Sequence, residues 1–250
     1  MLRFKFFPKF FLIIFLAFIL FTIIGTLSHE LGHIAVAKYF GYETTLDYGS
    51  MAYSKDFSND EDVKKIKKIS KEYIDSDYEE WPEDVKLKVE DLDEIIMSKY
   101  PYNETYKFQD LGIAIGGPAQ TLFTSFVGLL ILFLRRNKQN NGFNMFDWLA
   151  VFMSLFALRE VFNFLQAFYS FMFYSQSNFS GDEFEISRLI GFNEWIVPSL
   201  TLVLGVLISC YVIFKVIPLK YRFTFILSGL CGGILGFTLW FEFLGEILFN

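Results

Sequence analysis

The sequence predicts an all-α polytopic membrane protein with about five transmembrane helices, a short β-hairpin and a charged helical insert between the first two spans. Hydrophobic residues make up 53% of the 250 residues, and Phe alone occurs 33 times. A soluble domain does not carry this apolar excess. Several apolar stretches reach the length of about 20 residues that a helix needs to cross a bilayer. The charged residues, in contrast, concentrate in one segment near the N-terminal third of the chain.

The apolar stretches set the expected spans and domains. The spans run over 10–28, 111–134, 146–173, 195–216 and 223–249. We therefore expect a first transmembrane helix within 1–41, a hairpin and an acidic extramembrane insert over 42–110, and a core with four further spans over 111–250. The first stretch is too long for a signal peptide and lacks a small-x-small cleavage site, so it is expected to be retained. It continues through HELGHIAVAKYF and ends before Gly41, a residue that tolerates the left-handed geometry of a helix C-terminus.

Residues 42–110 hold 19 of the 28 acidic and 10 of the 22 basic residues, so this insert must lie outside the hydrocarbon. Its first part, YETTLDYGSMAYS, is rich in Thr and Tyr and is interrupted by Gly49, which indicates a hairpin. From Asp60 onward, apolar residues recur at helical spacing on both sides of Trp81. Two short amphipathic helices are expected there. They form either a solvated cap or a docking element for a substrate or partner.

The net charge argues against a nucleic-acid partner, and the cysteine content excludes a site built from cysteines. The net charge of −6 leaves no basic footprint for nucleic acid, so no nucleic-acid partner is expected. Cys210 and Cys231 stand far apart inside apolar runs and cannot form a disulfide framework or a cysteine metal knuckle.

The chain contains only two histidines, His29 and His33, and both lie in the pentapeptide HELGH at the end of the first span. Residues four apart are separated by about 40° around a helix, so both imidazoles project from one face. This arrangement suits two ligands of one tetrahedral zinc ion. Glu30 lies beside them, where a carboxylate can take a proton from a water that a bound zinc ion acidifies. The pattern predicts a zinc site, with one Zn²⁺ per chain, that hydrolyses a peptide bond.

HELGH at the end of an apolar helix, followed by AVAKYFGYETTLDYG, resembles the site-2 proteases, which are intramembrane zinc metalloproteases. The segment GGPAQT (116–121) is similar to the Gly-Pro motif of that family's next core helix, with Thr121 where the family often has Asn. The resemblance implies cleavage of membrane-embedded or membrane-adjacent segments of other membrane proteins. The expected location is therefore a lipid bilayer, in a cell (plasma) membrane.

The resemblance also implies that the third zinc ligand is an Asp from a later core helix. The family's full Asp-Gly motif is absent, and the best match is GDEFEISRLIG, which assigns the ligand to Asp182 with Glu183 as its nearest rival. As an alternative, Asp182 caps the helix that follows it. Other acidic residues in or beside spans have no neighbouring motif that resembles the family: Asp147, Glu160, Glu242 and Glu246.

The resemblance suggests substrate-binding residues as well. In the family, the hairpin after the HExxH helix offers an edge strand to the substrate, which points to Thr45 and Leu46, and the GGPAQT match adds Gly117 and Pro118. Asn163 and Arg159 lie four residues apart on the third span, where polar side chains must face the bundle or a wet cavity. They bind a substrate backbone, support Asp182 or tie helices together.

Orientation and activity each leave an alternative. Basic residues cluster before the first span, after the second and between the last two, which places the N-terminus inside and the C-terminus outside. The resemblance implies the opposite, with zinc toward the cytosolic side. For activity, the alternatives are a catalytically idle relative that regulates or escorts membrane proteins, and a different zinc membrane protease with a Glu third ligand. The intact Glu30 argues against the first, and the direct junction of HELGH with a span argues against the second.

Overall fold

The computed structural model describes residues 5–54, 56–73, 78, 81–101, 103–139, 142–174, 179 and 181–249. Within them, helices predominate, and five helical segments are long and apolar enough to cross a membrane. The segments are Pro8–Tyr39, Glu104–Asn137, Met145–Phe173, Ile196–Val216 and Leu219–Phe249. The predicted fold class, a mostly helical membrane protein with a hairpin after its first helix, is confirmed.

The first span, α1 (Pro8–Tyr39), is a single helix of 32 residues and thus about 48 Å long. Proline suits its first turn because the missing N–H would have no helical partner there. Gly41, just beyond its end, has the predicted left-handed backbone, with φ +86°. Since α1 exceeds the bilayer's hydrocarbon thickness of about 30 Å, its HELGH end lies near one membrane face.

The third predicted span is two helices, α5 (Met145–Ser154) and α6 (Leu158–Tyr174), joined by a tight 3-10 turn at Leu155–Ala157. The other helices of the bundle are α4 (Glu104–Gln139), α7 (Asp182–Leu189), α8 (Ile196–Tyr211), α9 (Leu219–Leu239) and α10 (Gly245–Phe249). Helix α4 begins before residue 111 and so includes the last residues of the segment that we expected to be extramembrane.

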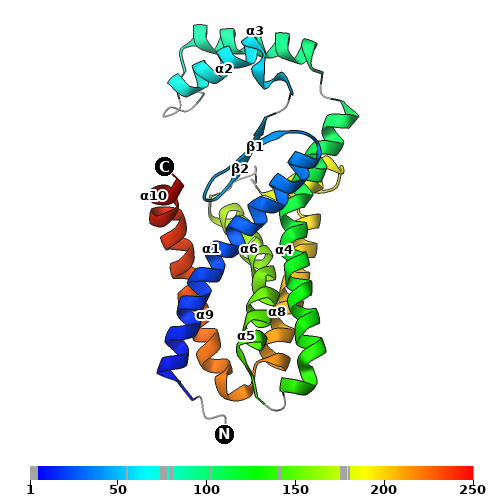
Figure 1. The fold of residues 1–250 in the computed structure, drawn as a ribbon. Helices are drawn as coiled ribbons and strands as arrows, with labels where there is room; N and C mark the ends of the chain where they lie inside the picture. Colours follow the sequence, from blue (N-terminus) through cyan, green and yellow to red (C-terminus); the bar gives the residue numbers. More distant parts are fainter. Residues whose placement is uncertain are drawn as a thin grey trace.

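Helix α1 crosses the bundle obliquely between α9 and α4 (Figure 1). Aromatic and branched side chains form the main apolar core toward the end where the chain starts. Its buried members are Ile14, Leu132, Ala150, Val151, Phe152, Leu155, Ala157, Ile208, Val212, Ile217 and Phe225. The opposite end carries HELGH, the hairpin and the insert (Figure 1).

The hairpin is anchored to the bundle on two sides. Strands β1 (Glu43–Leu46) and β2 (Met51–Ser54) pair antiparallel, as predicted. The hydroxyl group of Tyr53 donates a hydrogen bond of 3.0 Å to Asp110 of α4. At the turn, the Trp240 indole donates to the carbonyl of Tyr48 over 2.7 Å. These contacts hold the hairpin over the HELGH end of the bundle.

The insert forms the two predicted amphipathic helices, α2 (Glu61–Glu72) and α3 (Glu83–Lys99), which lie against each other beyond the hairpin (Figure 1). Asp60 caps α2 by accepting a hydrogen bond from the backbone N–H of Asp62. Residues 74–77, 79 and 80, in the predicted joint between the helices, lie outside the described residues.

Candidate metal centre

The two histidines lie where α1 crosses α4 at backbone contact. His29 and His33 are 0% and 5% exposed. A side chain on Gly32 of α1 would overlap the carbonyl of Gly116 in α4, and one on Gly116 would overlap the backbone of Gly32. Glycine at both positions therefore permits a close helix crossing, as small residues do in membrane bundles. This crossing brings α4 against the imidazole face of α1.

Gly117 faces the two imidazoles directly. A Cβ atom at this position would overlap the Nε2 atoms of both His29 and His33. The space beside these nitrogens is therefore open only because residue 117 has no side chain. Pro118 follows within α4 and is buried, and it deprives the helix of one backbone hydrogen bond at this turn.

Asp182, the first residue of α7, completes a group of three side chains. One ligand atom from each of His29, His33 and Asp182 lies within 4.8 Å of the others, so the group could hold a metal ion. The Oδ2 atom of Asp182 is 2.8 Å from His29 Nε2 and 3.2 Å from His33 Nε2. The two Nε2 atoms are 3.2 Å apart.

These separations fit one small cation. Ligand atoms at about 2.0–2.1 Å from a tetrahedral zinc ion lie roughly 3.3 Å from one another. The His29–His33 and His33–Asp182 distances, both 3.2 Å, match this spacing. The His29–Asp182 distance of 2.8 Å is shorter, and the side chain of Asp182 is 28% exposed. Two imidazole nitrogens and a carboxylate oxygen are also a common zinc donor set. The residues present therefore fit a zinc ion.

The far nitrogens of both rings are oriented by α4. His33 Nδ1 lies 2.6 Å from the carbonyl oxygen of Ile113. Since a carbonyl only accepts, this Nδ1 carries the proton, and the 3.3 Å approach of the Gly117 N–H is not a donation to it. His29 Nδ1 lies 2.9 Å from the hydroxyl oxygen of Thr121, which can accept in the same way. With both Nδ1 atoms protonated, the Nε2 lone pair of each ring is available to bind a metal ion beside Asp182.

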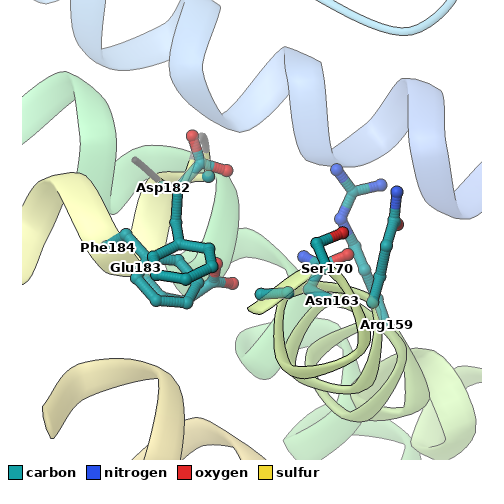
Figure 2. A pocket seen from close by; sticks show the side chains of 10 residues that line it. Arg159, Asn163, Ser170, Asp182, Glu183 and Phe184 are labelled. Carbon is teal, nitrogen blue, oxygen red and sulfur yellow. The ribbon is translucent and has the colours of Figure 1, made fainter. Parts of the chain in front are cut away.

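Glu30 follows His29 in α1 and is 5% exposed. Its Oε1 atom is 3.8 Å from an Nη atom of Arg159, at the start of α6. Arg159 belongs to a polar stripe on α6, which lines a cavity of about 270 Å³ together with Asp182 and Glu183. Figure 2 shows Arg159, Asn163 and Ser170 on one side of α6, across this cavity from Asp182 and Glu183. The cavity therefore provides a polar-lined space that reaches Asp182 of the candidate centre within an otherwise apolar bundle.

The remaining acidic residues lie outside the group of three. Glu183 is buried beside Glu160 of α6, and neither belongs to the metal group found among the described residues. Asp147 forms an ion pair with Arg135 at the other end of α4. Glu242 and Glu246 lie in the last span, in its π-helical turn and in α10.

The proposed substrate-binding residues are distributed over three elements. Thr45 and Leu46 lie in β1, where they pair with Ala52 and Met51 of β2. Gly117 lies against the histidines, and Asn163 lines the cavity.

Two features of the site did not emerge from the sequence. Thr121 drew attention only as a departure from a motif, and its contact with His29 depends on how α4 turns against α1. The approach of Arg159 to Glu30 was not anticipated, although an arginine inside a span is itself a signal. Comparison of the chain with protein-family models, with curated proteins and with solved structures finds no match.

Proposed function

We propose that this chain is an intramembrane zinc metalloprotease, similar to the site-2 proteases, that hydrolyses peptide bonds in or near transmembrane segments of other membrane proteins. The observation that carries the proposal is the meeting of His29, His33 and Asp182 beside Glu30. Asp182 lies 153 residues from His29 in sequence but 2.8 Å from it in space.

The side chains have distinct roles in the proposed reaction. His29, His33 and Asp182 hold the zinc ion, which when bound supplies a Lewis acid for the scissile carbonyl and makes water more acidic. Glu30 takes a proton from the attacking water as the water oxygen bonds to the carbonyl carbon. The same carboxyl group then gives that proton to the amine nitrogen as the peptide bond breaks. A single carboxylate therefore serves both halves of the hydrolysis.

Substrate must reach this site in an extended form, because helical peptide bonds are shielded by their own hydrogen bonds. Among the described residues β1 pairs only with β2, so its other edge offers backbone groups that can hold an extended peptide. Thr45 and Leu46 are the proposed contacts on β1, with Gly117 and Pro118 on α4 and Asn163 on α6. Pairing of substrate with β1 supplies hydrogen bonds that the bilayer does not.

The proposal is tested by Glu30→Gln, assayed against a single-span substrate in proteoliposomes. Loss of the general base is expected to lower kcat by about 10²- to 10⁴-fold while the zinc content stays unchanged. Glu185→Gln is the matched control, since Glu185 is an exposed carboxylate on α7, close to the site but outside the metal group. Undiminished cleavage by Glu30→Gln would exclude the mechanism.

A further inference from the structure

Arg159 is the cation that lines the cavity beside the candidate centre. Among the described residues that line it, Arg159 is the only Lys or Arg, and it faces the carboxylates Asp182 and Glu183. It lies in a span, where an ionisable group is costly unless it is paired or faces water. Its ion-pair partner is Glu30, whose side chain is 7% exposed, against 27% for Arg159.

The geometry of this pair is loose. At 3.8 Å, Oε1 of Glu30 and the Arg159 Nη atom attract each other electrostatically, but they are too far apart for a hydrogen bond. The Nε atom of Arg159 is buried and has no hydrogen-bond partner among the described residues. A buried donor without a partner destabilises the fold by about 1–3 kcal/mol, so stability alone does not favour this arrangement.

The loose pairing suits a carboxylate that must act on a water molecule. A direct, hydrogen-bonded pair would occupy the lone pairs of Glu30, which the attacking water needs. In the metal-free protein, the charge of Glu30 is repelled by the nearby carboxylate of Asp182 and attracted by the guanidinium of Arg159. Arg159 thus offsets this repulsion and leaves the carboxylate oxygens available.

We infer that Arg159 is a positioning residue, which holds the Glu30 carboxylate beside the metal ligands and oriented toward the attacking water. The inference rests on the proposed function for its role in cleavage, but the pairing itself is a property of the protein without metal. It acts through charge and position, so a lysine at residue 159 retains most of the effect and a neutral side chain retains none.

The test compares Arg159→Gln, Arg159→Lys and Arg135→Gln with the parent protein in proteoliposomes. Arg135→Gln is the matched control, because it also breaks an arginine–carboxylate pair of the bundle, but at the other end of α4. Arg159→Gln is expected to lower kcat by about 10- to 100-fold, as loss of a group that orients the reacting residues does, with KM changed less than about threefold. Arg159→Lys is expected to recover most of kcat.

A second measurement does not depend on activity. The melting temperatures of the metal-free parent, Glu30→Gln, Arg159→Gln and the double variant form a thermodynamic cycle. If the two residues are coupled, the double variant is expected to lose less stability than the sum of the losses in the two single variants. Additive losses would overturn the inference.

The two proposals fail in different ways. If Glu30→Gln is inactive but Arg159→Gln keeps its kcat, or loses no more kcat than Arg135→Gln, the role of Arg159 is wrong and the proposed protease stands. If Glu30→Gln cleaves normally, the proposed protease is wrong. The role of Arg159 in cleavage then falls with it, whatever the melting temperatures show.

Discussion

Two of the arginine–carboxylate pairs among the described residues lie at opposite ends of the helical bundle, and they differ in how completely their polar atoms are hydrogen-bonded. At the end with the apolar core, Arg135 Nε donates to Asp147 over 2.9 Å, and the other oxygen of Asp147 accepts the N–H of Asn144 over 2.9 Å. At the HELGH end, Arg159 and Glu30 stay 3.8 Å apart. A saturated pair fixes structure, whereas an unsaturated pair leaves lone pairs and donors for a reaction. The same types of side chain therefore do different work at the two ends.

The two ends also use glycine differently, and this gives the largest expected effect. Gly117 and Gly128 both lie in α4 where another element approaches closely. Gly117→Ala places a methyl group on the Nε2 atoms of the histidines, so we expect loss of bound zinc and of cleavage. Gly128→Ala meets the backbone of Ser154 instead and is expected to lower stability by about 1–3 kcal/mol with zinc retained.

Zinc per folded protein, measured by elemental analysis after size-exclusion chromatography, checks this contrast. A full equivalent of zinc in folded Gly117→Ala would show that the metal does not lie beside residue 117. Loss of zinc from folded Gly128→Ala would show that the two ends are not independent.

The saturated pair is broken by Asp147→Asn. Asp147 is fully buried, and removal of its charge leaves Arg135 without its ion-pair partner. Breaking a buried pair in this way destabilises a protein by about 3 kcal/mol or more. Chemical or thermal unfolding in detergent micelles measures the loss, while kcat of the folded fraction is expected to stay unchanged. A selective fall in kcat would contradict a purely structural role for this pair.

A smaller effect is expected from Thr121→Val, which keeps the shape of the side chain but removes the oxygen beside His29 Nδ1. Loss of a partner that orients a metal-binding histidine weakens metal affinity by about 10- to 100-fold. Competition with a fluorescent zinc chelator measures this change. Thr124→Val is the matched control, because its hydroxyl group accepts from Gln120 on the same helix. Equal affinities for the two variants would assign no role to Thr121.

Local patterns in the sequence predicted the parts of this molecule that depend on neighbours in the chain. The two histidines and Glu30 lie within one helical turn, and the hairpin follows from a short polar segment around Gly49. The break at Leu155–Ala157 was not predicted, because the residues around it are as apolar as the helices on each side. Asp182 required a resemblance, since spacing along the chain does not show that α7 returns to α1.

Contacts between helices could not be predicted in the same way. The approach of Arg159 to Glu30 depends on the rotation of α6 about its own axis, which an apolar span hardly constrains. The role of Thr121 likewise depends on the close crossing of α1 and α4 at Gly32 and Gly116. Both glycines are visible in the sequence, but their partners are visible only in space.

The insert carries solvent-exposed ion pairs between Asp62 and two lysines, which are weaker than the ion pairs of the bundle. Asp62 accepts hydrogen bonds from Lys65 and Lys99, and these contacts lower the pKa of its carboxyl group to about 2. The ordinary pKa of Asp is about 3.9, so the folded insert holds its charged form more strongly than the unfolded chain does. The stabilisation is therefore present above about pH 4 and is lost as the pH falls toward about 2. Because water screens these groups, their contribution to stability is the smallest of the four effects predicted in this Discussion.

Lys99→Met tests the part of this effect that Lys99 supplies, because it removes the ion pairs of Lys99 with Asp60 and Asp62 without touching the bundle. Digestion by pepsin between pH 2 and pH 5, normalised to an unstructured peptide at each pH, reports opening of the insert. The parent is expected to become more susceptible as the pH falls, whereas Lys99→Met is already susceptible at pH 5 and changes less. Parallel curves would show that the Lys99 contacts do not hold the two helices together. In that case the apolar contacts between α2 and α3, with the hydrogen bond from Tyr100 to Asp60, would keep the insert folded.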